Sequence, residues 1–410
     1  MRDGAGAIAI AQQTTSDTSW EPSPVPGISR NVFFLSVVSL LNDISSEMVY
    51  PLVPLFLAST LGAPASVMGI IEGFAEATAS VLKWVFGALS DRWGTRKPFC
   101  VAGYGLAALT KPLLAAAFAW PMVLGARVMD RFGKGLRASP RDALIANSTP
   151  ENLRGRAFGF NRSADSIGAV VGPLLAIGLL AAFQNNYRTA FLIAFLPGIV
   201  STLLVLPVRD RPTPPTRRAL LSFDAAGAAN PAMRRFLLIT LVFAVGNSSD
   251  MFLILRARQL GASGTTAVLL YALCNLLNVL SSYPAGVVSD RIGRKGVLAV
   301  GFVLFGGIYV GFGMAGGASA LWVLFPLYGV YLGLTDGVAK ALVVDLVPSA
   351  ERGAALGLQA AITGFSTLPA SVVAGLLWQY VSPGATFYYG AVTALAAAAM
   401  MAALRVSRAG

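Results

Sequence analysis

Histidine is absent from the 410-residue sequence, and cysteine occurs only at Cys100 and Cys274. Without histidine, Ser-His-Asp hydrolysis, imidazole metal sites and histidine proton relays are excluded. Both cysteines fall inside apolar segments, so they are not read as a disulfide framework or a metal-ligand set. We therefore expect no enzyme active site and no resident cofactor, and any proton chemistry must use carboxylates.

Charge is also scarce, because only 12% of the residues are charged whereas 55% are hydrophobic. The mean hydropathy of +0.67 is too high for a soluble protein of this length and indicates that the lipid bilayer is the solvent. Stretches close to the ~20 apolar residues needed to cross a bilayer predict an all-α membrane protein with twelve transmembrane helices in two sets of six. The expected spans are residues 33–59, 66–89, 98–118, 121–147, 157–182, 188–207, 236–258, 265–288, 297–316, 320–347, 354–380 and 385–405.

Acidic residues are the rarer charge, with 19 Asp and Glu against 31 Lys and Arg, which gives a net charge of +12. The basic side chains gather in alternate loops between the expected spans, and such loops stay in the cytoplasm. We therefore expect both termini to be cytoplasmic, in a bacterial inner membrane. These loops and one basic helix account for the charge, so the expected partners are the bilayer and a small-molecule substrate, not nucleic acid. The expected state is a monomer.

Composition divides the chain into four segments. Residues 1–29 are rich in Ser, Thr, Gly and Pro and predict a disordered cytoplasmic tail. A six-helix bundle is expected over 30–207 and a second over 236–405. Between them, residues 208–235 combine prolines with arginines and predict a cytoplasmic linker.

A short basic loop occurs twice. Gly87-Ala-Leu-Ser-Asp-Arg-Trp-Gly-Thr-Arg-Lys97 is echoed by Gly286-Val-Val-Ser-Asp-Arg-Ile-Gly-Arg-Lys295, with an offset of 199 residues at the first glycine. Ser45-Ser-Glu-Met48 in the first expected helix likewise resembles Ser248-Ser-Asp-Met251 in the seventh. The common order of these matches indicates that the two bundles are related by an internal repeat.

These motifs resemble those of the major facilitator superfamily, over the chain from about Asn31 onward. The loop resembles that family's G-x-x-x-D-R-x-G-R-K signature, and two further elements resemble its R-x-x-Q-G-x-G and G-x-x-x-G-P patterns. The R-x-x-Q-G-x-G pattern is incomplete here, because Asp130 replaces the usual glutamine and Arg131 the usual glycine. The resemblance implies two six-helix domains that rock about a central site, and its last element implies antiport driven by the proton gradient. The residues that carry the likeness, and that we expect to serve gating, are Gly87, Asp91, Arg92, Gly94, Arg127, Asp130, Asp142, Gly168, Gly172, Pro173, Asp290 and Arg291.

The fourth expected helix carries seven charged residues: Arg127, Asp130, Arg131, Lys134, Arg137, Arg141 and Asp142. At ~100° per residue they fall within an arc of about 140°. Such a face cannot contact lipid, and its excess of cations would attract an anion into a cavity. We expect Lys134 and Arg137, near mid-depth, to contact substrate. The charges nearer the two ends could equally form ion pairs among themselves, and Asp142 could pair with Arg92.

The first expected helix places Asp43, Glu47 and Tyr50 on one face by their i, i+4, i+7 spacing. Loss of hydration at mid-depth disfavours a charged carboxylate, so Asp43 or Glu47 could load and release a proton. Glu76 on the second helix is a third candidate, and it could also pair with Lys83 or with the fourth helix. The alternative is that these acids only neutralise the basic helix. Lys111 is expected to snorkel from an outer helix end.

The remaining substrate-binding candidates come from both halves, and the full set is Tyr50, Lys134, Arg137, Arg141, Arg162, Asp165, Asn275, Asp336 and Lys340. Together these features predict a secondary transporter that exchanges protons for a small organic anion or zwitterion and exports it. The runner-up is a multidrug antiporter of lipophilic cations that would bind to Asp43, Glu47 and Glu76. A lipid flippase or a non-transporting membrane receptor is a more distant alternative.

Overall fold

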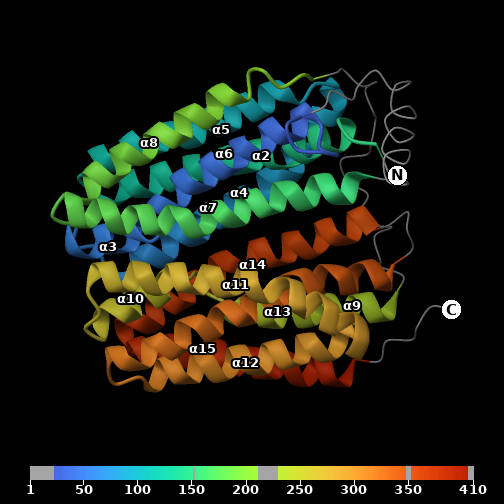
Figure 1. The fold of residues 1–410 in the computed structure, drawn as a ribbon. Coiled ribbons are helices and arrows are strands. Elements are labelled where there is room, and N and C mark those ends of the chain that lie inside the picture. Colours follow the sequence, from blue (N-terminus) through green and yellow to red (C-terminus); the bar gives the residue numbers. More distant parts are fainter. Residues whose placement is uncertain (1–22, 151–152, 211–229, 348–351, 405–410) are drawn as a thin grey trace, which may run out of the picture.

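The structure, a computed structural model, describes residues 23–150, 153–210, 230–347 and 352–404. Within these ranges the chain forms helices and no strand. Figure 1 shows two helical bundles side by side, one from each half of the chain. The bundle of the first half contains α2 (Arg30–Val49), α3 (Leu52–Ser59), α4 (Ala65–Trp93), α5 (Lys97–Ala116), α6 (Trp120–Asn147), α7 (Arg154–Ala182) and α8 (Tyr187–Leu204).

The bundle of the second half has the same plan. It contains α9 (Pro231–Gly246), α10 (Met251–Gln259), α11 (Gly264–Ile292), α12 (Arg294–Met314), the 3-10 turn η2 (Ala318–Ala320), α13 (Leu321–Leu346), α14 (Arg352–Tyr380) and α15 (Pro383–Ala403). Each of the twelve expected spans is matched by a helix or by a broken helix, so the prediction of two six-helix bundles is confirmed.

The first and seventh spans are broken near the same point of the repeat. In the first, α2 ends at Val49 and α3 begins at Leu52, because Pro51 has no N–H with which to continue the ladder of helix hydrogen bonds. In the seventh, α9 ends at Gly246 and α10 begins at Met251. Both breaks therefore lie beside the repeated Ser-Ser-acid-Met sequence.

Two boundaries differ from those expected from composition. Helix α9 begins at Pro231, inside the range 208–235 assigned to the linker, because the Asn230 side chain caps it by accepting from the N–H of Ala232 at 2.9 Å. Residues 23–29, the described part of the expected tail, include Ile28, which is buried against the first bundle. The rest of the tail lies outside the described residues.

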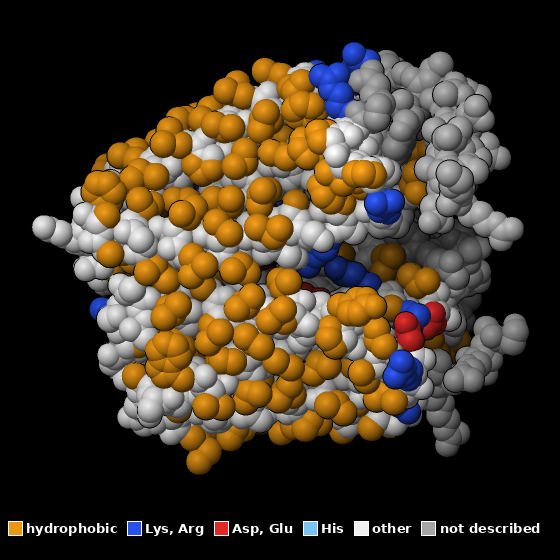
Figure 2. Space-filling model, viewed as in Figure 1, with side chains coloured by type: hydrophobic (Ala, Val, Ile, Leu, Met, Phe, Trp, Pro, Cys, Tyr) orange, Lys and Arg blue, Asp and Glu red, His pale blue; other side chains and the backbone are white. Residues whose placement is uncertain are grey.

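The exterior of the molecule is apolar, as lipid contact requires. Figure 2 shows hydrophobic side chains spread over both bundles, and large apolar residues such as Phe118 and Leu196 are exposed. Among the described residues, ten spans are long and apolar enough to cross a membrane. Helices α4 and α6 are outside that set, and they pack against each other.

The two ends of the molecule differ in charge and in packing. The end that carries Arg30, Lys97, Arg209, Arg234 and Arg294, on the right in Figure 1, is called the basic end. The opposite end, which carries α3 and α10, is called the sealed end because the bundles meet there. Towards the basic end the bundles separate, and Figure 2 shows Lys and Arg side chains inside the hollow between them.

Contact between the bundles runs along two helix pairs, α4 with α14 and α7 with α11. Glycines bring the first pair to backbone contact: a Cβ atom on Gly69 would collide with the carbonyl oxygen of Ser371, and one on Gly375 would lie 2.8 Å from the Cα of Ser66. Ser66 also donates a hydrogen bond to the Gln379 side chain across the interface. Small residues that let helices approach in this way are a common means of helix association in membranes.

We expect Gly69→Ala to weaken the sealed end. The added methyl meets backbone that cannot swing away, and overpacking of this kind costs about 1–3 kcal/mol. In a Ser66→Cys background, a membrane-impermeant thiol reagent should label the cysteine faster when Gly69→Ala is present. The native cysteines, Cys100 and Cys274, are buried and should add little background.

Gly125→Ala is the matched control, since a Cβ at Gly125 meets nothing within 4 Å. It should leave the labelling rate unchanged. Equal rates for Gly69→Ala and Gly125→Ala would mean that α4 and α14 do not hold this end closed.

Candidate functional site

A group of six charges, of which Glu76 is partly exposed and the other five are buried, joins α4, α5 and α6 and is called the buried ion network. Arg127 Nη2 lies 2.9 Å from both carboxylate oxygens of Glu72, and Arg131 Nε lies 2.8 Å from Glu76 Oε1. Lys111 Nζ lies 3.0 Å from Asp130 Oδ1, and Arg131 Nη1 lies 3.5 Å from Asp130 Oδ2. Three cations thus face three carboxylates, so the network is neutral.

The ion pairs of the network confirm two predictions about α6 and show that the one about Lys111 is wrong. The ion pairs proposed among Arg127, Asp130 and Arg131 are present, and Glu76 pairs with α6, one of its two expected partners. Lys111 does not snorkel: it is 2% exposed and also donates to the Ala107 carbonyl, because the carboxylate of Asp130 lies within its reach. The sealed half of α6 therefore has no excess charge to offer a ligand.

Further along α6, Lys134 and Arg137 form no ion pair with the described residues. Lys134 is exposed and makes no ion pair or hydrogen bond with the described residues. The Arg137 guanidinium lies 4.8 Å from the centre of the Tyr104 ring, and its Nη1 is buried without a hydrogen-bond partner in the described chain. These two residues, expected to contact substrate, thus keep donors that no described residue accepts from.

The hollow receives more cations from other helices. Lys83 of α4 is exposed and lies within electrostatic range of Lys134 and of Lys340 on α13, across the bundle boundary. Arg162 of α7 and Lys340 are also exposed, and Asp336 of α13 is the carboxylate near both. Basic side chains from both bundles therefore line the hollow, as Figure 2 shows.

Arg141 is occupied by its neighbours, unlike Lys134. Its Nη2 lies 3.0 Å from Asp142 Oδ1, and its Nη1 donates to Ser39 Oγ at 2.9 Å and lies 3.7 Å from Asp165 Oδ1. Asp142 thus pairs on its own helix. The side chain of its other proposed partner, Arg92, is outside the described part of the structure. The surroundings of Gly87 and Asp91 are also outside it.

Two acids of α2 pack on the glycines of α7. A Cβ atom on Gly168 would lie 2.8 Å from the Cβ of Asp43, and one on Gly172 would lie 2.7 Å from the Cβ of Glu47. Asp43 Oδ1 accepts from the Asn42 side chain at 3.1 Å. The glycines of the G-x-x-x-G-P element, which ends at the buried Pro173, therefore let the acid-bearing turns of α2 lie directly against α7.

Glu47 and Tyr50 also reach the second bundle. The hydroxyl of Tyr271 on α11 donates to Glu47 Oε2 at 3.0 Å, and its ring lies 5.5 Å from that of Tyr50. The guanidinium of Arg127 lies over the ring of Tyr50, 5.4 Å from the ring centre. A contact chain thus runs from the buried ion network through two tyrosines to Glu47.

Asn275 of α11 adds a second contact between the bundles, because its amide donates to the Ala169 carbonyl at 3.0 Å. Neither Tyr271 nor its bond to Glu47 follows from sequence patterns alone. Tyr271 stands 199 residues after Glu72, which is the offset of the repeat, so Tyr271 occupies in the second bundle the position that Glu72 occupies in the first.

Both copies of the basic loop turn on a glycine with left-handed backbone, Gly94 with φ 68° and Gly293 with φ 95°. In the second copy, Asp290 lies 3.7 Å from Arg294, which also lies 2.9 Å from Asp345 on α13. Arg291 is exposed. The repeat seen in the sequence therefore places a glycine with positive φ at each turn, whereas ψ differs, at 3° for Gly94 and 137° for Gly293.

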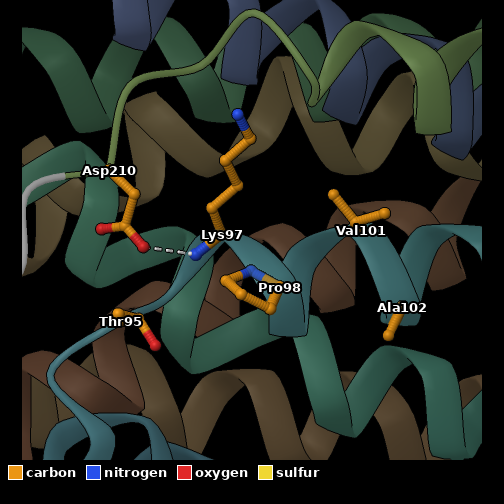
Figure 3. Close-up of a pocket in the computed structure, with 6 residues that line it drawn as sticks. All are labelled: Thr95, Lys97, Pro98, Val101, Ala102 and Asp210. Carbon is orange, nitrogen blue, oxygen red and sulfur yellow. Dashed lines mark hydrogen bonds between the residues drawn. The ribbon is translucent and has the colours of Figure 1, made fainter.

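The first copy of the loop is tied to the chain that leaves α8. Asp210 Oδ2 accepts from the backbone N–H groups of Arg96 and Lys97 at 2.5 and 2.7 Å, at the start of α5. Lys97 Nζ donates to the Leu206 carbonyl at 2.6 Å. Lys97 and Asp210 also line a separate open pocket of about 560 Å³, together with Thr95, Pro98, Val101 and Ala102. Figure 3 shows these six residues.

Comparison with known proteins gives consistent matches over nearly the whole chain. The sequence profile of the Major Facilitator Superfamily matches residues 35–254 and 235–409. An uncharacterized MFS-type transporter of Methanocaldococcus jannaschii is 35% identical over 377 residues, which cover 90% of this chain and 93% of the relative.

Two further matches extend the comparison. The multidrug resistance protein MdtH of Aeromonas hydrophila is 28% identical over 367 residues, which cover 87% of each chain. A crystal structure of the nucleoside transporter NupG aligns with a TM-score of 0.77 at 16% identity, covering 90% of this chain and 100% of that one. At this identity the structural likeness speaks for the fold alone.

We expect Glu72→Gln to destabilise the protein strongly. It removes both carboxylate contacts of Arg127 and leaves the buried ion network with a net positive charge, and breaking a buried pair in this way costs about 3–5 kcal/mol. The thermal midpoint of the purified protein should fall well below that of the wild type.

Pairing Glu72→Gln with Arg127→Met should recover most of the loss, because the double variant restores neutrality. Asp290→Asn, at an exposed position of the second basic loop, should leave the midpoint unchanged. If Glu72→Gln melts like Asp290→Asn, the network does not compensate charge as described.

Proposed function

The chain belongs to the major facilitator superfamily and is a multi-pass membrane transporter of a small molecule, and we propose that it exports an organic anion or zwitterion in exchange for protons. One observation carries the choice of substrate. The six charges of the buried ion network cancel, whereas Lys134, next on the same face of α6, has an ammonium group in the hollow that pairs with no described residue.

The surrounding charges support an anionic ligand. Lys83, Arg162 and Lys340 are exposed towards the same region from three different helices, and the carboxylates that act on them are Asp142, Asp165 and Asp336. Lys134, Arg137 and Arg141 add three more cations, so positive charge is in excess. A cleft of one sign with low-dielectric walls raises the local concentration of the opposite charge. Because Lys83 and Lys340 belong to different bundles, an anion between them would also reduce their repulsion when the bundles approach.

The proton-binding groups of this proposal are carboxylates, since the chain has no histidine. Asp43 and Glu47 are partly exposed, and neither forms an ion pair within 4 Å among the described residues. Glu76 is bound to Arg131 and takes third place. An uncompensated carboxylate at this depth is costly in the charged form, which favours binding of a proton.

An exporter must bind its solute from the cytoplasmic side. The hollow opens at the basic end, and basic loops are retained in the cytoplasm. In this proposal, solute binds from the basic end, the bundles rock, and the sealed end opens to the outside. Protons then enter from the outside and reset the cycle.

A second candidate function is efflux of lipophilic cations. Its support is the name of the relative MdtH, a multidrug resistance protein, at 28% identity. Such a substrate would bind to Asp43 and Glu47 and would gain nothing from Lys134. The first function therefore depends on the cation Lys134, whereas the second depends on the carboxylates Asp43 and Glu47.

A ligand screen with the purified protein separates them. Citrate and glucose 6-phosphate serve as anion probes, and tetraphenylphosphonium serves as the cation probe, each at two pH values. A ligand at about 100 times its dissociation constant stabilises by ~2.7 kcal/mol. We expect an anion to raise the thermal midpoint of the wild type, and this shift to be lost in Lys134→Ala and kept in Lys134→Arg.

Arg235→Ala removes an exposed cation of α9 outside the hollow and should keep the shift. Stabilisation by tetraphenylphosphonium that survives Lys134→Ala would instead identify a cation exporter. The charges of α6 would then be structural.

We expect Asp43→Asn to uncouple protons from solute. In vesicles loaded with the solute found by the screen, a pH gradient should no longer drive accumulation. Exchange of labelled for unlabelled solute should persist, because it needs no net proton movement. Proton-driven accumulation that survives Asp43→Asn and disappears in Glu47→Gln would assign the coupling role to Glu47.

A further inference from the structure

The acid of the first helix break has a counterpart in the second bundle. Glu47 belongs to Ser45-Ser-Glu-Met48, just before the break between α2 and α3, and Asp250 belongs to Ser248-Ser-Asp-Met251, in the break between α9 and α10. The duplication thus places one carboxylate at each break, and both breaks face the sealed end.

The side chain of Asp250 is not used as a helix cap. Asp250 occupies the N-cap position of α10, where aspartate normally accepts from a backbone N–H, but it makes no such bond. Its Oδ1 accepts instead from the hydroxyl of Tyr328 on α13 at 2.6 Å. The other oxygen makes no hydrogen bond with the described residues, so it is available to a proton.

No cation lies within 4 Å of Asp250 among the described residues. The charged groups that act on it most strongly are the carboxylates of Asp336 on α13 and of Glu72 and Glu76 on α4. The nearest cation along the contact chain, Arg127, is committed to Glu72 and to the Tyr50 ring. The other titratable groups that face it are Tyr50 of α2, Tyr271 and Cys274 of α11, Tyr309 of α12, and Tyr328 and Tyr331 of α13.

This setting differs from that of the acids in the first bundle. Glu72, Glu76 and Asp130 each lie within 3.5 Å of an Arg or Lys nitrogen, which balances their charge. The Asp250 carboxylate has only the Tyr328 hydroxyl as a described hydrogen-bond donor, and Asp336, Glu72 and Glu76 are the charged groups that act on it most. A carboxylate inside a bilayer that has no cation lowers its free energy by taking up a proton.

We propose that Asp250 is a second proton-binding carboxyl of the transport cycle, carried by the second bundle and related by the repeat to Glu47. The step is a proton transfer from water to Oδ2, which neutralises the side chain while Tyr328 continues to donate to Oδ1. Tyr50, across the bundle boundary, is within electrostatic range of Asp250, so the proton is held near the contact between bundles. The assignment rests on the proposed proton coupling and adds a second proton site to it.

Infrared difference spectra of the purified full-length protein, recorded between alkaline and acidic buffers, test this assignment without any solute. The wild type should show the C=O stretch of protonated carboxyl groups. Asp250→Asn should remove one component of that band, and proton uptake, followed with an indicator dye, should fall by one proton per chain. Tyr328→Phe should keep the component and shift both its frequency and its midpoint pH, because the donor to Oδ1 is lost.

Asp290→Asn is the control at an exposed acid and should leave the protonated-carboxyl component intact. Asp250→Glu keeps the proposal testable if the asparagine variant does not fold, because it should retain the component at a shifted frequency. The assignment is overturned if Asp250→Asn, folded as judged by its thermal midpoint, gives the wild-type band and proton uptake. It is also overturned if Tyr328→Phe leaves the component where it was.

The outcome is separable from that of the solute experiments. Failure of every anion probe would reject the proposed substrate class and leave the infrared band of Asp250 unaffected. Loss of the band in Glu47→Gln or Asp43→Asn, with none in Asp250→Asn, would uphold proton coupling and confine it to the first bundle, which rejects the second site.

Discussion

The constraint on which the rest of this structure depends is that charge inside a bilayer must be compensated. The network of Glu72, Glu76, Lys111, Arg127, Asp130 and Arg131 meets it within the first bundle, where six charges cancel at distances near 3 Å. That cancellation allows α4 and α6, which carry these charges together with α5, to remain inside the membrane. Lys134 and Asp250 lie outside this balance. In the functions proposed above, an anionic ligand compensates the charge of Lys134, and a proton neutralises Asp250.

The duplicated sequence has been put to different uses in the two halves. Glu72 and Tyr271 are separated by the repeat offset, and they now form opposite sides of one contact chain that passes through Arg127 and Tyr50 to Glu47. The first bundle concentrates formal charge, and the second presents phenols and amides to it. Such a division lets the bundles touch at the sealed end without bringing two sets of like charges together.

Much of the fold was predictable because its determinants are local. Runs of apolar residues fix the spans, Pro51 breaks the first of them, and glycines at Gly94 and Gly293 set the repeated turns. Side-chain partners were less accessible, since they depend on which helices become neighbours. Lys111 was expected at the lipid headgroups and is instead buried, because α5 packs on α6 and brings Asp130 within 3.0 Å. The bond from Tyr271 to Glu47 spans 224 residues and no local pattern encodes it. The roles of Asp43, Lys134 and Arg137 remain predictions about chemistry.

Few polar bonds hold the sealed end. Those that join the described parts of the bundles include Tyr271 to Glu47, Asn275 to Ala169 and Ser66 to Gln379. A net contribution of about 0.5–1.5 kcal/mol for each hydrogen bond puts the polar share of this closure at only a few kcal/mol. A ligand that binds one conformation about a hundredfold more tightly than the other supplies ~2.7 kcal/mol. The polar part of the closure is therefore of the same size as a modest difference in affinity, so a bound ligand that prefers one conformation can offset it.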